Sequence, residues 1–102
     1  MPTMIVLGRL KGDVEPADYE RWVLESYAPT TRELPSASYW HNHRVNGLLG
    51  SDEEPPYDYL VTLVVADKAR LGEDVAGERM LGLLSELYGY ADVTQLMAER
   101  FV

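Results

Sequence analysis

The segment Tyr59–Val65, with the sequence YLVTLVV, constrains the fold more than any other part of the chain. It is rich in β-branched and apolar residues, which is typical of a β-strand. Its odd and its even positions are both largely apolar. An antiparallel strand with one face in water should instead alternate between apolar and polar residues. We therefore expect both faces of this strand to be covered by other parts of the protein.

The flanking sequence predicts the element order β-α-β-β-α-β in one domain over residues 1–102. The predicted elements are a strand over 4–10, a helix over 16–27, strands over 37–48 and 59–65, a helical region after Asp67 that begins in two pieces, and a strand over 93–102. Pro29 should break or kink the first helix, and Gly89 should end the second. This order predicts an α+β, ferredoxin-like fold, with both helices on one face of a four-stranded antiparallel sheet.

The opposite face of this sheet then needs a different cover. A second copy of the chain supplies one most simply, because a chain of 102 residues buries a limited share of its own surface. We therefore predict a homodimer in which two sheets pack face to face. The alternative is a central strand whose outer face is partly covered by a loop.

Composition excludes several classes of function. The formal net charge is −8, which disfavours binding to nucleic acid or to an anionic membrane surface. There is no cysteine, so thiolate metal sites and cysteine nucleophiles are absent, and a cytoplasmic location is expected. No apolar stretch approaches the length of a membrane span, and the first residues do not read as a signal peptide. Nucleotide-binding and metalloprotease motifs are also missing, so we expect no cofactor.

The two histidines of the chain, His41 and His43, lie two residues apart in a predicted strand and therefore on the same side of it. Three interpretations stay open. In the first, the pair is structural and its ring nitrogens bind neighbouring carboxylates. In the second, one of the histidines is a general acid or base that faces a ligand. The third interpretation is a metal site, which would need a further ligand such as Glu25 or Glu99, and our prediction includes no metal.

Arg44 and a group of aromatic residues are the other candidate site residues. Arg44 either neutralises a negative charge on a substrate or forms a salt bridge in this acidic protein. Tyrosine and tryptophan combine a large apolar ring with a polar tip, which suits a pocket for a flat aromatic ligand. The candidate substrate-binding residues are Tyr19, Trp22, Tyr27, Tyr39 and Trp40. The alternative for each of them is an ordinary place in the core or at the surface.

Several segments carry a resemblance to a known family. They are GRLK at 8–11, YERWV at 19–23, TRELPS at 31–36, HRV at 43–45 and YDYLVT at 57–62. With the element order and the size, they make the chain similar to the dimeric α+β barrel superfamily and, more narrowly, to RedY-like proteins, the HapK-like family of prodigiosin- and bisindole-type pathways. The C-terminal half matches only in pattern.

The resemblance implies a part in bacterial secondary metabolism, acting on indole or pyrrole alkaloid intermediates. It leads us to expect a cofactor-independent cyclase, with His41, His43 and Arg44 as catalytic residues and a small aromatic substrate. The alternatives are a cofactor-free monooxygenase of the same superfamily and a non-catalytic binder of a reactive intermediate.

Overall fold

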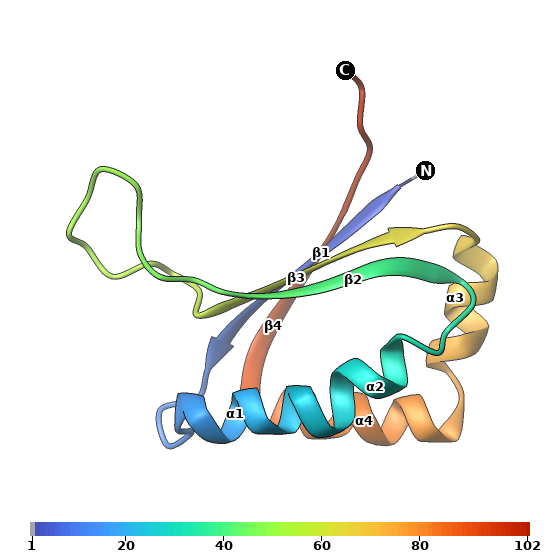
Figure 1. Ribbon diagram of the computed structural model, residues 1–102, viewed down its shortest axis with the longest axis horizontal. Coiled ribbons are helices and arrows are strands. Elements are labelled where there is room, and N and C mark those ends of the chain that lie inside the picture. The colour runs from blue at the N-terminus through green and yellow to red at the C-terminus, as the bar shows by residue number, and fades with distance from the viewer. Residues whose placement is uncertain (1) are drawn as a thin grey trace.

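The computed structural model describes residues 2–102. Four strands, β1 (Thr3–Leu10), β2 (Ala37–Arg44), β3 (Tyr59–Val65) and β4 (Ala91–Ala98), form one sheet in the order β2-β3-β1-β4. All three neighbouring pairs are antiparallel. Figure 1 shows this sheet above α1, α2 and α4 and beside α3, with both chain ends pointing away from α1 and α4. The predicted ferredoxin-like α+β fold is confirmed.

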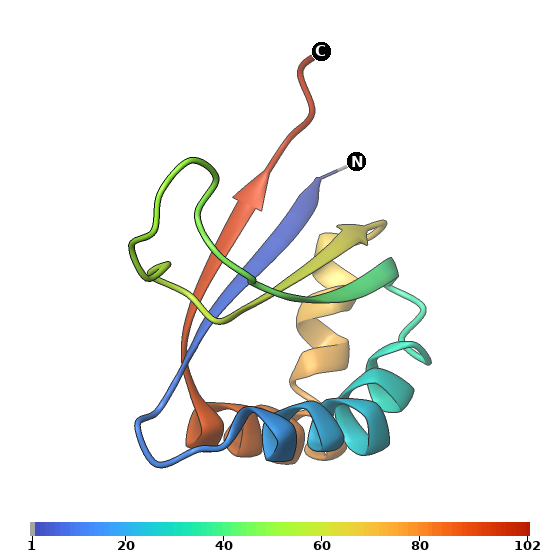
Figure 2. The same cartoon turned by 60° about the vertical axis from the view of Figure 1, so that its left-hand side comes forward.

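The helices gather on one face of the sheet, as Figure 2 shows. They are α1 (Pro16–Trp22), the π-helical segment η1 (Val23–Tyr27), α2 (Ala28–Thr31), α3 (Lys68–Val75) and α4 (Glu78–Tyr90). The odd residues of β3 point toward them and are buried, with Leu63 and Val65 each 1% exposed. The even residues Leu60, Thr62 and Val64 are only half-buried. We call the face that carries these even residues the open face.

Pro29 was expected to break or kink the first helix, and of these two outcomes the break is wrong. The helical run does not break after Tyr27 but continues through α2 to Thr31. Proline lacks an N–H and would clash with the carbonyl four residues earlier in a regular α-helix. The wider π turn just before Pro29 avoids this conflict, and within it the Ala28 N–H donates to the Val23 carbonyl, five residues back.

The second helical region begins in two pieces, as predicted. The Asp67 side chain caps α3 by accepting a hydrogen bond of 3.0 Å from the Arg70 backbone N–H. A short break at Ala76 and Gly77 separates α3 from α4. Helix α4 then runs one residue past Gly89, so the predicted stop at Gly89 is one residue early.

Two strands differ from their predicted bounds. Strand β2 ends at Arg44 rather than at residue 48, because the following segment belongs to the long polar loop that precedes β3. Strand β4 begins at Ala91 and ends at Ala98, instead of spanning 93–102, because it starts directly at the end of α4 and stops where its pairing with β1 stops.

A β-bulge changes which residues of β2 share a face. Two residues, Tyr39 and Trp40, occupy the space opposite one residue of β3, because Ser38 pairs with Val64 while His41 pairs with Thr62. Tyr39 adopts a φ of 56° there. Simple alternation along β2 would put Ser38 on the face opposite the histidines, but the bulge places it on the open face with them.

The open face is apolar at its centre. Strand register places the following apolar residues on it: Ile5, Leu7, Leu60, Val64 and Leu96. None of the helices described for residues 2–102 lies against this face (Figure 2). No helix in that part of the chain is long and apolar enough to cross a lipid bilayer.

Candidate functional site

A cavity of about 470 Å³ lies between the helix-covered face of the sheet and helices α3 and α4. Its walls are mostly apolar. The lining includes Met4, Val6, Leu63, Leu71, Val75, Met80, Leu84, Leu87 and Met97. Its volume is within the range of about 300–1,000 Å³ that is usual for small-molecule pockets. We call this the large cavity.

Aromatic and polar side chains complete the wall of the large cavity. Tyr27 and Trp40 face each other edge-on there, with ring centroids 6.2 Å apart. Tyr88, Lys68 and Gln95 are the polar residues that also line it. An apolar space with few polar groups suits a flat aromatic ligand that carries one or two heteroatoms.

A smaller cavity of about 280 Å³ opens between α1 and the strands β2 and β3. Three polar side chains meet at its wall, one from each element. Arg44 donates to Glu20 through Nε at 2.9 Å and through a second guanidinium nitrogen, forming a bidentate ion pair. The Tyr59 hydroxyl donates to the same carboxylate at 2.6 Å. The salt-bridge interpretation of Arg44 is thus the one that the structure shows.

This cluster shifts the pKa values of its members. The hydrogen bond from Arg44, followed by that from Tyr59, lowers the pKa of Glu20 from 4.5 to about 2. Burial and the contact with Glu20 raise the pKa of Tyr59 to about 12. The charged carboxylate is therefore the form that holds α1 to the edge of the sheet.

Acid should weaken this attachment. Because the pKa of Glu20 is lower in the folded protein, its ion pair stabilises the fold above pH 4.5 and is lost as the pH falls toward 2. We predict that the difference in Tm between the wild type and Glu20→Gln is largest above pH 4.5 and closes below it. Thermal melts across this range, with the exposed loop variant Glu54→Gln as a control, would measure it. Parallel pH profiles for wild type and Glu20→Gln would contradict this role.

The two histidines lie on the open face rather than in the large cavity. His41 pairs with Thr62 and His43 with Leu60, which places both on the same side of β2, as predicted. Their rings are 6.3 Å apart and nearly perpendicular. His43 also contributes to the wall of the smaller cavity beside Arg44. Both residues are exposed in the single chain.

Of the five aromatic candidates, three line one of the two cavities and two line neither. Tyr27 and Trp40 line the large cavity, and Tyr19 lines the smaller one. Trp22 is buried, and its Nε1 donates to Glu86 of α4 at 2.8 Å, so it joins α1 to α4. Tyr39 is 70% exposed at the bulge and lines neither cavity in the described part of the chain.

Sequence reasoning missed several residues of these sites. Glu20 lies 24 positions before Arg44, and the sequence did not indicate which carboxylate of this acidic chain Arg44 would pair with. Lys68, Tyr88 and Gln95 had no local signal, because they come together only where α3, α4 and β4 meet. Among residues 2–102, no group of three or more histidines and carboxylates is placed to hold a metal ion.

The sheet, the helices on one face and the cavity between them define a ferredoxin-like α+β protein with an internal apolar pocket. A family model described as "REDY-like protein HapK" matches residues 2–101. The chain therefore belongs to the HapK family of REDY-like proteins, in agreement with the resemblance found in its sequence.

Comparison with solved structures supports the fold. HapK from Hahella chejuensis superposes with a TM-score of 0.81 at 26% identity, covering 99% of this chain and 93% of that one. SnoaB from Streptomyces nogalater, a cofactor-independent oxygenase, gives a TM-score of 0.75 at 16% identity, with coverage of 99% and 93%. A dimeric ferredoxin-like protein of unknown function from Thermobifida fusca gives 0.74 at 16% identity, with coverage of 96% and 90%. A search of curated proteins finds no significant match.

Proposed function

We propose that the protein is a cofactor-independent cyclase that closes a ring in an indole- or pyrrole-type aromatic intermediate of bacterial secondary metabolism. The observation that carries the proposal is the large cavity, an apolar space of about 470 Å³ with Tyr27 and Trp40 in its wall. Membership of the HapK family supports a small aromatic substrate.

Positioning would supply most of the catalytic effect. A ring closure needs two parts of one molecule to be held at reacting distance, and well-aligned systems gain on the order of 7–11 kcal/mol in this way. The apolar walls of the cavity would select one folded conformer of the substrate and exclude water. The chemistry would then proceed in cytoplasm without a bound cofactor.

The proposal assigns proton transfer to His41 and His43, with Arg44 beside them in sequence but on the helix-covered face and paired with Glu20. The histidines lie across the sheet from the large cavity, so they reach only a reacting group of the substrate that extends past the edge strand β2 to the open face. Histidine exchanges protons near neutral pH, which suits a general acid or base. The two residues lie at the edge of the apolar open face, and a second copy packed on that face would enclose them. The proposal therefore includes a homodimer, for which the apolar residues of the open face are the support.

A cofactor-free monooxygenase is the second candidate, because SnoaB, a cofactor-independent oxygenase, has the same fold. A non-catalytic binder of a reactive intermediate is the third. The three are separated by two measurements made together, oxygen uptake and the yield of ring-closed product per protein molecule. A cyclase gives many turnovers without oxygen uptake, an oxygenase consumes oxygen, and a binder protects stoichiometrically without turnover.

The histidine assignment has its own test. We expect the double variant His41→Ala/His43→Ala to lose about a hundredfold or more in turnover, as is common for removal of a general acid or base. The matched control is Ser38→Ala, because Ser38 lies on the same strand and the same face. Turnover of linked bis-indole and bis-pyrrole substrates by purified protein measures the effect. Unchanged turnover in the double variant would show that the histidines do not move the proton.

A further inference from the structure

The hydroxyl of Tyr27, like Trp40 Nε1, is a polar group in the wall of the large cavity that no other described part of the protein binds. The Tyr59 hydroxyl donates to Glu20, and the Trp22 indole donates to Glu86. Within residues 2–102, the Tyr27 hydroxyl has no hydrogen-bond partner, although the residue as a whole is only 4% exposed. A largely buried polar group that no protein atom binds needs water or a ligand as its partner.

The Tyr27 hydroxyl also differs from groups that are simply sealed in the core. Ser36 Oγ and Trp40 Nε1 are unpartnered atoms closed off from any solvent-sized molecule. The Tyr27 hydroxyl is not among these closed atoms, and its side chain lines the large cavity. A molecule in the cavity is therefore able to reach it.

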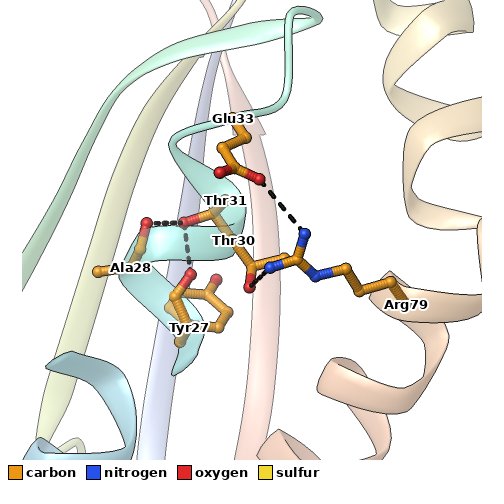
Figure 3. A network of polar contacts seen from close by, with 6 residues as sticks. All are labelled: Tyr27, Ala28, Thr30, Thr31, Glu33 and Arg79. Carbon is orange, nitrogen blue, oxygen red and sulfur yellow. Dashed lines mark hydrogen bonds and ion pairs between the residues drawn. The ribbon is translucent and has the colours of Figure 1, made fainter. Parts of the chain in front are cut away.

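The local backbone holds the Tyr27 side chain in this place. Tyr27 is the last residue of the π segment, whose extra residue per turn changes the direction of the side chains that follow it. Its backbone carbonyl accepts a hydrogen bond of 2.8 Å from the Thr31 hydroxyl, which Figure 3 shows. In the same figure, Arg79 of α4 binds Thr30 at 3.2 Å and Glu33, and so anchors α2 against α4.

The ring of Tyr27 is fixed as well. It packs against Trp22, with ring centroids 5.5 Å apart, and edge-on against Trp40 at 6.2 Å. A ring in contact with two indoles has little freedom to turn its hydroxyl toward another partner. The hydroxyl thus lies ready for a ligand before the ligand arrives, which lowers the entropic cost of binding.

We propose that the Tyr27 hydroxyl donates a hydrogen bond to a carbonyl oxygen of the ligand in the large cavity, so that the protein selects aromatic ketones or aldehydes over their hydrocarbon counterparts. This inference rests on the proposed function, because it assumes that the large cavity is the ligand site. It adds the chemical class of the ligand and the residue that recognises it.

The protonation state of Tyr27 agrees with a donor role. Burial, together with the nearby Tyr19 and Tyr88, raises the pKa of Tyr27 well above its ordinary value. The phenol therefore keeps its proton at neutral pH, so it donates and does not act as a base. A hydrogen bond to a carbonyl oxygen also makes the carbonyl carbon more electrophilic. This effect suits a ring closure in which a nucleophilic ring atom of the same molecule attacks that carbon.

The test compares two ligands and two variants. The ligands are an acetylindole and an ethylindole substituted at the same ring carbon, which differ in one carbonyl oxygen. The variants are Tyr27→Phe and, as a matched control, Tyr57→Phe in the loop before β3. Affinities are measured by titration of backbone amide chemical shifts, and stability by thermal melts.

We expect Tyr27→Phe to weaken binding of the acetylindole roughly threefold to tenfold, the range for one neutral hydrogen bond, and to leave ethylindole binding unchanged. Tyr57→Phe should bind both ligands as the wild type does. The Tm of Tyr27→Phe should equal or exceed that of the wild type, because an unpartnered hydroxyl contributes no stability. Equal loss for both ligands, or a lowered Tm, would assign Tyr27 a structural role and overturn the inference.

Failure of the broader proposal gives a different result. If neither ligand binds the wild type, the large cavity is not an aromatic site, and both the proposed function and the inference are wrong. If both ligands bind and Tyr27→Phe changes neither affinity, only the inference about Tyr27 is wrong.

Discussion

Replacing Gly72 by phenylalanine should remove most of the protein's affinity for aromatic ligands. Gly72 lies on α3 in the wall of the large cavity, and a Cβ atom at this position would meet no neighbouring atom within 4 Å. Gly72 is exposed in the single chain, so a phenyl group there would stand at the rim of the cavity and reduce the space open to the ligand. A ligand forced into a filled space loses about 1–3 kcal/mol, which corresponds to roughly a fivefold to hundredfold loss of affinity.

The chain offers a matched control for this substitution. Gly82 lies on α4, also has open space where a Cβ atom would stand, and does not line the large cavity. We expect Gly82→Phe to bind acetylindole within about twofold of the wild type, a change smaller than the energy of one hydrogen bond. Isothermal titration calorimetry on the three proteins measures the difference. Equal affinity in Gly72→Phe and the wild type would place the ligand outside the large cavity.

Replacing Val64 by lysine should convert the proposed dimer to a monomer. Val64 lies on the open face of β3, next to Thr3 of β1 and Ser38 of β2. In a symmetric interface each copy would bring one unpaired charge to the same buried surface. Burial of such a charge costs several kcal/mol, so we expect the dissociation constant to rise by about a hundredfold or more.

Sedimentation equilibrium at micromolar concentration measures this effect. The wild type should sediment at twice the chain mass of 11.5 kDa, and Val64→Lys at the chain mass itself. Leu49→Lys is the control, because Leu49 is fully exposed in the loop between β2 and β3. Circular dichroism should show the same fold in all three proteins. A folded wild type at the mass of one chain would contradict the dimer.

The fold was predictable because its signals are local and periodic. The strand Tyr59–Val65 has the composition and length of a buried strand, and the structure confirms its bounds. The second helical region was predicted to begin after Asp67, and the Asp67 side chain does cap it by accepting a hydrogen bond from the Arg70 backbone N–H. Such features depend on a few neighbouring residues, so one sequence is enough to read them.

The errors arose where tertiary packing overrules a local rule. Pro29 predicted a break or a kink, and the break is wrong because the π turn before it lets the helix continue to Thr31. The bulge at Tyr39 and Trp40 depends on pairing with β3, and alternation along β2 alone does not reveal it.

The candidate site was only partly predictable for a related reason. Leu71, Val75 and Leu84 are apolar residues of the predicted second helical region, and the structure shows that they line a cavity. Whether apolar residues leave a space or fill it depends on how the helices cross the sheet. The pairing of Glu20 with Arg44 also depends on the tertiary structure, because the two residues are 24 positions apart and meet only where α1 packs on β2.

The location of the bound ligand tests the account most directly. Intermolecular nuclear Overhauser effects are measured from the ring protons of bound acetylindole to the methyl groups of the protein. We predict contacts to Leu71, Val75 and Leu84 of the large cavity. Contacts instead to Ile5, Leu7 and Val64 of the open face would contradict the account.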